Sequence, residues 1–258
     1  MSRNSDLEMK YPSLLFLLSF AAFWLAVKVG SAIRNRRPDF LDEDKRADLT
    51  VIQAATFTLL GIIIGFSFSM SVSRYDQRKN YEEEEANAIG TEYLRVELLR
   101  PADAAAAKAQ LKTYLEQRIA WYVTRDPGQL VQIYSDEGKV GADLWSAVRK
   151  GVVDQPAAVV TLTVSGVNDV LNRQGYTEAA WLNRIPVGAW IMMLTVAWFG
   201  AFLLGIGARR PGAFVSLTLP FVFALVFFLI ADLDSPRWGV IRVHPLDLLN
   251  LSGSLNPP

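Results

Sequence analysis

Four apolar stretches, each about as long as a helix that crosses a lipid bilayer, constrain what this chain can fold into. They cover residues 12–33, 49–73, 186–208 and 213–231. A helix of about 20 apolar residues spans the hydrocarbon core of a membrane. The last three stretches carry no charged residue, and the first carries only Lys28, near its end. The sequence therefore predicts an integral membrane protein.

The order of these stretches predicts an all-α protein with four transmembrane helices in two pairs and a helical cytoplasmic domain inserted between spans 2 and 3. The expected parts are an N-terminal membrane hairpin over 1–73, a helical soluble domain over 74–184, a C-terminal membrane hairpin over 185–234 and a tail over 235–258. The length of the first span and its charge-balanced flank favour a retained helix over a cleaved signal peptide. The final LSGSLNPP is expected to be frayed.

Proline and glycine mark the expected helix boundaries inside the soluble domain, because proline starts helices readily and cannot continue them. The second span is expected to continue unbroken into this domain. The boundaries are, in chain order, a stop at Leu99 with a new helix from Pro101, a break at 125–129, a helix over 129–150 that can split at Gly138, and a last helix opened by Pro156 that ends near Gly175.

Composition excludes several classes of function. The formal net charge is zero, so no basic field predicts a nucleic-acid partner. The chain has no cysteine and one histidine, His244, which removes thiolate chemistry and any histidine-based metal cluster. No nucleophile paired with a base is visible in the sequence. We therefore expect neither an enzyme nor a cofactor.

The segment GIIIGFSFSMSVSRYDQRKNYEEEEANAIGTEYLR, residues 61–95, passes from apolar to charged without a proline. Small residues recur in it at every fourth position and so lie on one face of a helix. Small residues let transmembrane helices approach closely, so we interpret this face as a helix-packing surface. The residues are Gly61, Gly65, Ser69 and Ser73.

A second stripe on the same span holds Thr58, Ile62 and Phe66, again four residues apart. Two interpretations are open for the two stripes. Both can pack inside one helix bundle, as transmembrane helices commonly do. Alternatively, the small face contacts a neighbouring subunit and the larger stripe forms a narrow apolar ring that gates a central pore by dewetting.

The same span resembles the second transmembrane helix of bestrophins, where a Gly-Phe pair precedes a Thr/Ser-Arg-aromatic turn. The matching residues are 65–66 and 73–75. The whole chain is similar to a group of uncharacterised bacterial bestrophin-like membrane proteins. It shares with them EEANAIGTEYLR at 84–95, NRIPVGAW at 183–190 and DLDSPRWGVIRV at 232–243.

This resemblance implies a pentameric anion channel with an apolar neck at Thr58, Ile62 and Phe66, where Thr58 departs from the usual aliphatic residue. Animal bestrophins also bind calcium through an acidic run after the fourth helix. The counterpart here, Asp232 and Asp234, is too sparse to carry that property over. The sequence leaves any metal undetermined.

Five charged residues near the membrane boundary are candidates for ion binding or ion pairing, because a charge at a membrane edge must pair or face water. The run EEEE at 82–85 is interpreted as a solvated helix face, and a ring of such runs would favour cations. The two aspartates after the fourth span are expected to pair with Arg74, Arg184 or Arg237. The candidates are Arg74, Glu84, Glu85, Asp232 and Asp234.

The sequence thus favours a homo-oligomer in the lipid bilayer that conducts chloride or other small anions passively. The alternative is a non-conducting scaffold or sensor whose helical domain binds a partner. Nine basic residues near the spans on the side of the N-terminus against seven on the other predict cytoplasmic termini and a cytoplasmic domain. The bacterial inner membrane is the expected location.

Overall fold

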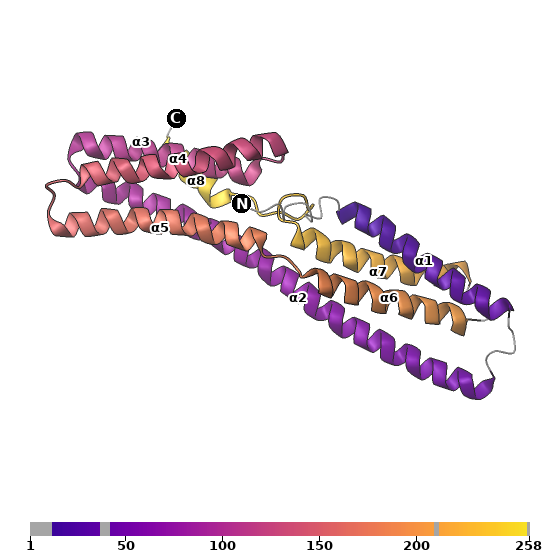
Figure 1. Ribbon diagram of the computed structural model, residues 1–258. Helices are drawn as coiled ribbons and strands as arrows, with labels where there is room; N and C mark the ends of the chain where they lie inside the picture. Colours follow the sequence, from indigo (N-terminus) through magenta and orange to yellow (C-terminus); the bar gives the residue numbers. More distant parts are fainter. Residues whose placement is uncertain (1–11, 37–41, 209–211, 257–258) are drawn as a thin grey trace. The chain divides into compact units, whose positions relative to one another are not determined.

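The computed structural model describes residues 12–36, 42–208 and 212–256, and within these ranges all regular structure is helical (Figure 1). The prediction of an all-α chain is therefore confirmed. The elements are α1 (Pro12–Arg36), α2 (Glu43–Arg95), a 3₁₀ turn η3 (Val96–Leu98), α3 (Pro101–Val123), α4 (Pro127–Gly151), α5 (Ala157–Leu182), α6 (Val187–Gly207), α7 (Ala213–Asp234) and α8 (Leu246–Leu255).

The chain forms two compact units, each assembled from segments that are distant in sequence. The first contains Met1–Ser73 and Arg184–Arg242, and the second contains Arg74–Asn183 and Val243–Pro258. Helix α2 contributes residues to both. Four helical stretches of the described chain are long and apolar enough to cross a membrane, judged by length and composition.

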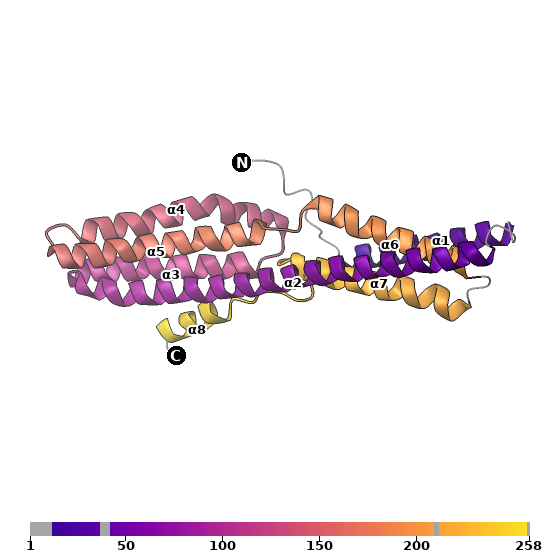
Figure 2. The same cartoon turned by 90° about the horizontal axis from the view of Figure 1, so that it is seen from below.

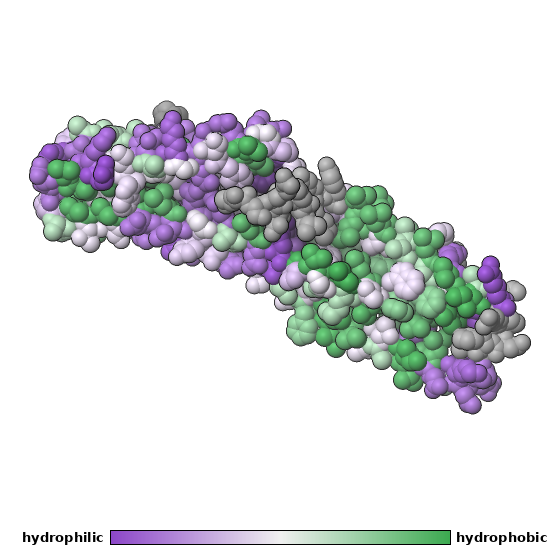
Figure 3. Space-filling model, in the orientation of Figure 1, coloured by the Kyte–Doolittle hydropathy of each residue, from purple (hydrophilic) through white to green (hydrophobic). Residues whose placement is uncertain are grey.

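The first unit packs α1, α6, α7 and the apolar part of α2 around a core that includes Phe23, Met193 and Phe227. Its visible surface over α1, α6 and α7 is mostly hydrophobic (Figure 3). Such a surface is stable in lipid, whereas in water it would be an extended exposed apolar patch. The unit therefore has the character of a membrane domain.

Helices α1 and α6 approach each other closely at two glycines. A Cβ atom on Gly30 would lie 2.9 Å from the backbone nitrogen of Ile206, and one on Gly205 would lie 2.9 Å from the carbonyl carbon of Val27. The hydroxyl of Ser31 donates to the carbonyl oxygen of Gly205 at 3.3 Å. This is the small-residue packing that membrane helices use in place of a hydrophobic driving force.

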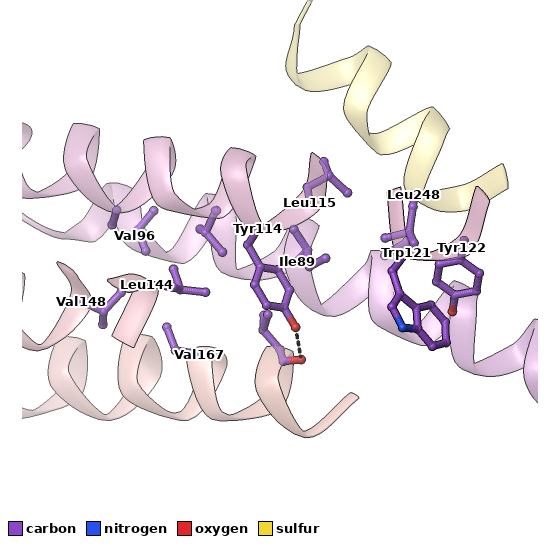
Figure 4. Close-up of a cluster of buried hydrophobic side chains, with 14 of the residues drawn as sticks. Ile89, Val96, Tyr114, Leu115, Trp121, Tyr122, Leu144, Val148, Val167 and Leu248 are labelled. Carbon is purple, nitrogen blue, oxygen red and sulfur yellow. Dashed lines mark hydrogen bonds between the residues drawn. The ribbon is translucent and has the colours of Figure 1, made fainter. Parts of the chain in front are cut away.

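The second unit is a bundle in which α3, α4, α5 and the polar part of α2 run alongside one another (Figures 1 and 2). Its core contains aliphatic and aromatic side chains from every one of these helices and Leu248 from α8 (Figure 4). The hydroxyl of Tyr114 donates to the side-chain oxygen of Gln174 at 2.6 Å, so a polar group within this core is satisfied.

Several expected boundaries are confirmed. Pro101 occupies the first turn of α3, as expected, and α4 begins at Pro127, two residues before the expected start; in both first turns the missing N–H costs nothing. The carboxylate of Asp126 accepts the N–H of Gln129 at 2.8 Å and caps α4. Helix α2 ends at Arg95, and η3 carries the chain to the turn before Pro101.

Three expected boundaries are wrong. Helix α4 runs through Gly138 without a split, and α5 continues past Gly175 to Leu182. Tertiary packing overrides the weak helix propensity of glycine there, because Val170 and Trp181 are buried on either side of Gly175. The tail is also not frayed up to Leu255, since it forms α8.

Replacing Gly205 with alanine is expected to force α1 and α6 apart, because the new methyl group would overlap the backbone at Val27. Overpacking of this kind costs about 1–3 kcal/mol, so the melting temperature in detergent should fall. Gly188→Ala in the same helix is the matched control, because a Cβ atom there meets nothing within 4 Å. Equal melting temperatures for the two variants would contradict the close contact.

Candidate functional site

The candidate site begins on the apolar part of α2, whose two faces have different environments. One face packs into the first unit through the fully buried Leu60 and through Gln53, whose side-chain amide donates to the carbonyl oxygen of Leu203 at 2.6 Å. The hydroxyl of Ser71, also buried, donates to the carbonyl oxygen of Ser67 at 2.9 Å. This face fixes α2 against α6.

The other face of α2 carries the predicted neck stripe, and it is open in the chain. Phe66 is 72% exposed and Ile62 is 52% exposed, and Thr58 is exposed beside them. Only 6% of the most apolar window of α2 is buried, against 28–44% for the other three candidate spans. More than half of the surface of Ile62 and of Phe66 is therefore left uncovered by the described part of the chain.

The predicted small face is open as well. Gly61, Gly65, Ser69 and Ser73 are all exposed, and a Cβ atom on either glycine would meet nothing within 4 Å. Neither stripe is therefore buried by the described part of this single chain, and packing inside one helix bundle stays an open interpretation. The small residues leave room on the surface of α2, and no described part of this chain fills it.

The acidic run behind the membrane part of α2 is not a simple solvated face. Only Glu83 is exposed. The carboxylate of Glu82 accepts the N–H groups of Asp247 and Leu248, both at 3.0 Å, at the start of α8. Glu84 pairs with Arg173 on α5. The first turn of α8 is thus held by hydrogen bonds to a side chain that is distant in sequence.

Glu85 belongs to a buried polar cluster that sequence reasoning missed. Its carboxylate pairs with the Nε of Arg118 on α3, and it also accepts the hydroxyls of Tyr122 at 3.3 Å and Thr177 at 3.1 Å. Arg118 and Glu85 are 1% and 0% exposed. Ion pairs this deeply buried must be well hydrogen-bonded to offset desolvation, and Glu85 meets that condition.

Two further carboxyl groups complete the cluster. Nη1 of Arg118 lies 3.0 Å from Glu137 on α4 and 3.1 Å from Glu178 on α5. Burial, and then the adjacent Glu178 carboxyl, raises the pKa of Glu137 to about 8, so this group holds a proton at pH 7. One arginine therefore binds carboxyl groups from three other helices.

A periodic signal for this cluster is present in the sequence. Arg118 falls on the apolar stripe of α3, seven residues after Leu111, and Glu85 falls four residues before Ile89 on the buried face of α2. A charged residue at an apolar spacing predicts a buried charge, which needs a partner. No group of three or more metal-ligating side chains among the described residues has a geometry that could hold a metal ion.

Asp232 and Asp234, at the end of α7, organise the backbone around them. The carboxylate of Asp232 accepts the N–H groups of Val240 at 2.6 Å and Ile241 at 2.7 Å. That of Asp234 accepts the N–H of Ile185 at 3.1 Å. Both side chains are buried. Asp232 therefore closes the turn that follows α7, and Asp234 ties the end of α7 to the connection before α6.

The arginines predicted to pair with these aspartates lie nearby or in the other unit. Nη1 of Arg184 donates to the carbonyl oxygen of Asp234 at 2.7 Å, and Arg237 is buried in the same turn. Arg74 is half-buried on α2 at the start of the second unit. Gly239 is required in this turn, because a Cβ atom there would lie 2.9 Å from the carbonyl oxygen of Ser235.

These features define an all-helical membrane protein with a second unit rich in buried charge. A family model described as a Bestrophin-like domain matches residues 14–248. The chain therefore belongs to the Bestrophin-like family, and the resemblance drawn from its motifs is confirmed.

Solved structures support the same fold. A bacterial bestrophin homolog from Klebsiella pneumoniae is 14% identical, with a TM-score of 0.68 over 94% of this chain and 96% of that one. A mutant of such a homolog from the same organism is 15% identical, with a TM-score of 0.65 over 94% and 99%. No curated protein sequence matches the chain. At these identities the structural likeness establishes the fold alone.

Replacing Arg118 with methionine is expected to destabilise the second unit by about 3–5 kcal/mol, because Glu85 would remain buried without its cation. Glu97→Gln is the control. It removes an exposed pair with Lys108, which is worth about 1 kcal/mol or less. Chemical unfolding followed by tryptophan fluorescence, to which the buried Trp121 and Trp181 of the second unit contribute, measures both. Equal losses of stability in the two variants would mean that the buried cluster contributes no more than an exposed ion pair.

Proposed function

We propose that this protein is a homo-oligomeric membrane channel that conducts chloride or other small anions passively. In this proposal α2 lines the pore, and Thr58, Ile62 and Phe66 form its apolar neck. The small face of α2 contacts the neighbouring subunit. By resemblance to bestrophins the oligomer is a pentamer, located in a bacterial inner membrane with both termini and the helical unit in the cytoplasm.

The observation that carries this proposal is the open face of α2. Phe66 and Ile62 are more than half exposed on a helix whose opposite face is buried. A purely lipid-facing surface would be uniformly apolar, whereas this one includes Thr58 and glycine–serine steps. Ring closure by identical subunits would cover the small residues and bring the larger stripe toward a common axis.

The charges after the membrane part of α2 are compatible with anions. Four exposed glutamates per subunit would repel them. Glu82, Glu84 and Glu85 are instead engaged with backbone N–H groups or arginines inside the second unit. The acidic run therefore produces a much weaker negative field than its four glutamates would if all of them were exposed.

The neck is tested by chloride efflux from liposomes that contain the purified protein. Phe66→Ala and Ile62→Ala are expected to increase efflux, because a wider and less apolar constriction wets more easily. Phe68→Ala is the matched control, since Phe68 lies on the same helix outside the stripe. Efflux from the wild type that rises for Phe66→Ala and not for Phe68→Ala supports the neck.

Silence of the wild type and of both neck variants, with the oligomer intact, would contradict conduction. It would favour the alternative, a membrane scaffold or sensor whose helical unit binds a partner. Equal increases for Phe66→Ala and Phe68→Ala would contradict the assignment of the neck to this stripe.

The small face is tested by the mass of the protein in detergent. Gly65→Leu is expected to dissociate the oligomer, because a large side chain prevents close approach of the next subunit. The fold of the chain should survive, since a Cβ atom at Gly65 meets nothing within 4 Å. Gly188→Leu, equally open but on α6, is the control. An unchanged oligomer in Gly65→Leu would remove this face from the interface.

A further inference from the structure

Glu92 is a buried carboxyl group that no role described above explains. It lies on α2 in the second unit, outside the membrane-spanning segment, and its residue is 0% exposed. Neither carboxyl oxygen has a hydrogen-bond partner. Buried polar groups in proteins are nearly always paired, so an unpaired carboxyl requires a physical reason.

The Glu92 side chain rests on Gly166 of α5. A Cβ atom on Gly166 would lie 2.6 Å from the carboxyl carbon of Glu92 and 2.9 Å from Nη1 of Arg95. The glycine therefore provides the space that the carboxyl group fills. A larger residue on α5 at this position would have to displace the end of the Glu92 side chain.

The charged groups that act on Glu92 come from both helices in contact. Arg95 lies one turn along α2, and Asp169 lies one turn along α5 from Gly166. Arg95 forms no ion pair with Glu92. Beyond them, Glu84 and Arg173 neutralise each other in the small hollow, about 230 Å³, that Arg95 and Asp169 also line.

We propose that Glu92 is a proton-binding site whose ionisation loosens the packing of α2 against α5. The neutral acid fits against Gly166 at modest cost. A carboxylate without a partner in that position is far more costly, and moving toward Arg95 or water relieves it. That movement requires the two helices to separate at Gly166. The inference concerns the second unit alone and does not depend on conduction.

The direction in which the packing of α2 against α5 changes with pH follows from the burial of Glu92. Burial raises the pKa of Glu92 to about 8 from an ordinary value of 4.5, while Arg95 lowers it and Asp169 raises it. The packed state therefore holds one proton more than the opened state between these values. Packing is strongest below pH 4.5 and weakens as the pH rises to 8, by at most about tenfold in the opening equilibrium per pH unit.

The test is amide hydrogen exchange of residues 159–170 in the full chain in detergent, from pH 5 to 9, for the wild type and Glu92→Gln. The ratio of the two rates cancels the intrinsic pH dependence of exchange. Wild-type protection should fall relative to Glu92→Gln up to about pH 8 and then level off. Glu83→Gln, an exposed site on the same helix, should behave as the wild type.

Two variants of neighbouring residues show whether Glu92 causes the pH-dependent loss of protection, even if Glu92→Gln does not fold. This is needed because the pKa values of Glu82 and Glu137 are raised into the same range. Arg95→Gln should move the levelling point to higher pH, and Asp169→Asn should move it to lower pH. A step that persists in Glu92→Gln, or that stays in place in both neighbouring variants, overturns the proposal.

Discussion

The structure depends on one constraint, which is that α2 buries part of its surface within each unit while another part of it stays exposed. Its buried residues include Leu60, Ser67 and Ser71 in the first unit and Glu82, Glu85 and Ile89 in the second. In the apolar segment, Thr58, Ile62 and Phe66 lie on the exposed part of the helix.

The helices could be predicted well from the sequence because two local signals determine them. A charge-free run of about 20 residues has few alternatives to a membrane helix, and prolines fix where the soluble helices begin. The failures have non-local causes. Helix α8 is held by Glu82 at its start and by the ammonium group of Lys112, which donates to the carbonyl oxygen of Leu255 at 2.8 Å. Neither partner is near it in sequence.

The candidate site also has one part that local sequence signals predict and one part that they do not. The two stripes on α2 follow from four-residue spacing, and their location on one helix needs no tertiary information. The buried cluster cannot be predicted from local spacing, because Arg118 contacts Glu85, 33 residues away, and Glu178, 60 residues away. Spacing alone indicates that Glu85 and Arg118 occupy apolar positions. Which carboxyl groups converge on the arginine is decided by how three other helices pack, and that is not encoded locally.

The acidic run shows why the residue types in a sequence do not by themselves determine the charge of a surface. Between residues 76 and 91 the exposed charged side chains of α2 are Asp76, Lys79 and Glu83, which sum to one negative charge. The other glutamates of the run each contact another helix: Glu82 contacts α8, Glu84 contacts α5 and Glu85 contacts α3. Those contacts stabilise the helical unit, and because they bury Glu82 and Glu85 and pair Glu84 with an arginine, they also leave less uncompensated negative charge on the outer face. In the second unit the exposed side of α2 is therefore nearly neutral, although the run itself is strongly acidic in sequence.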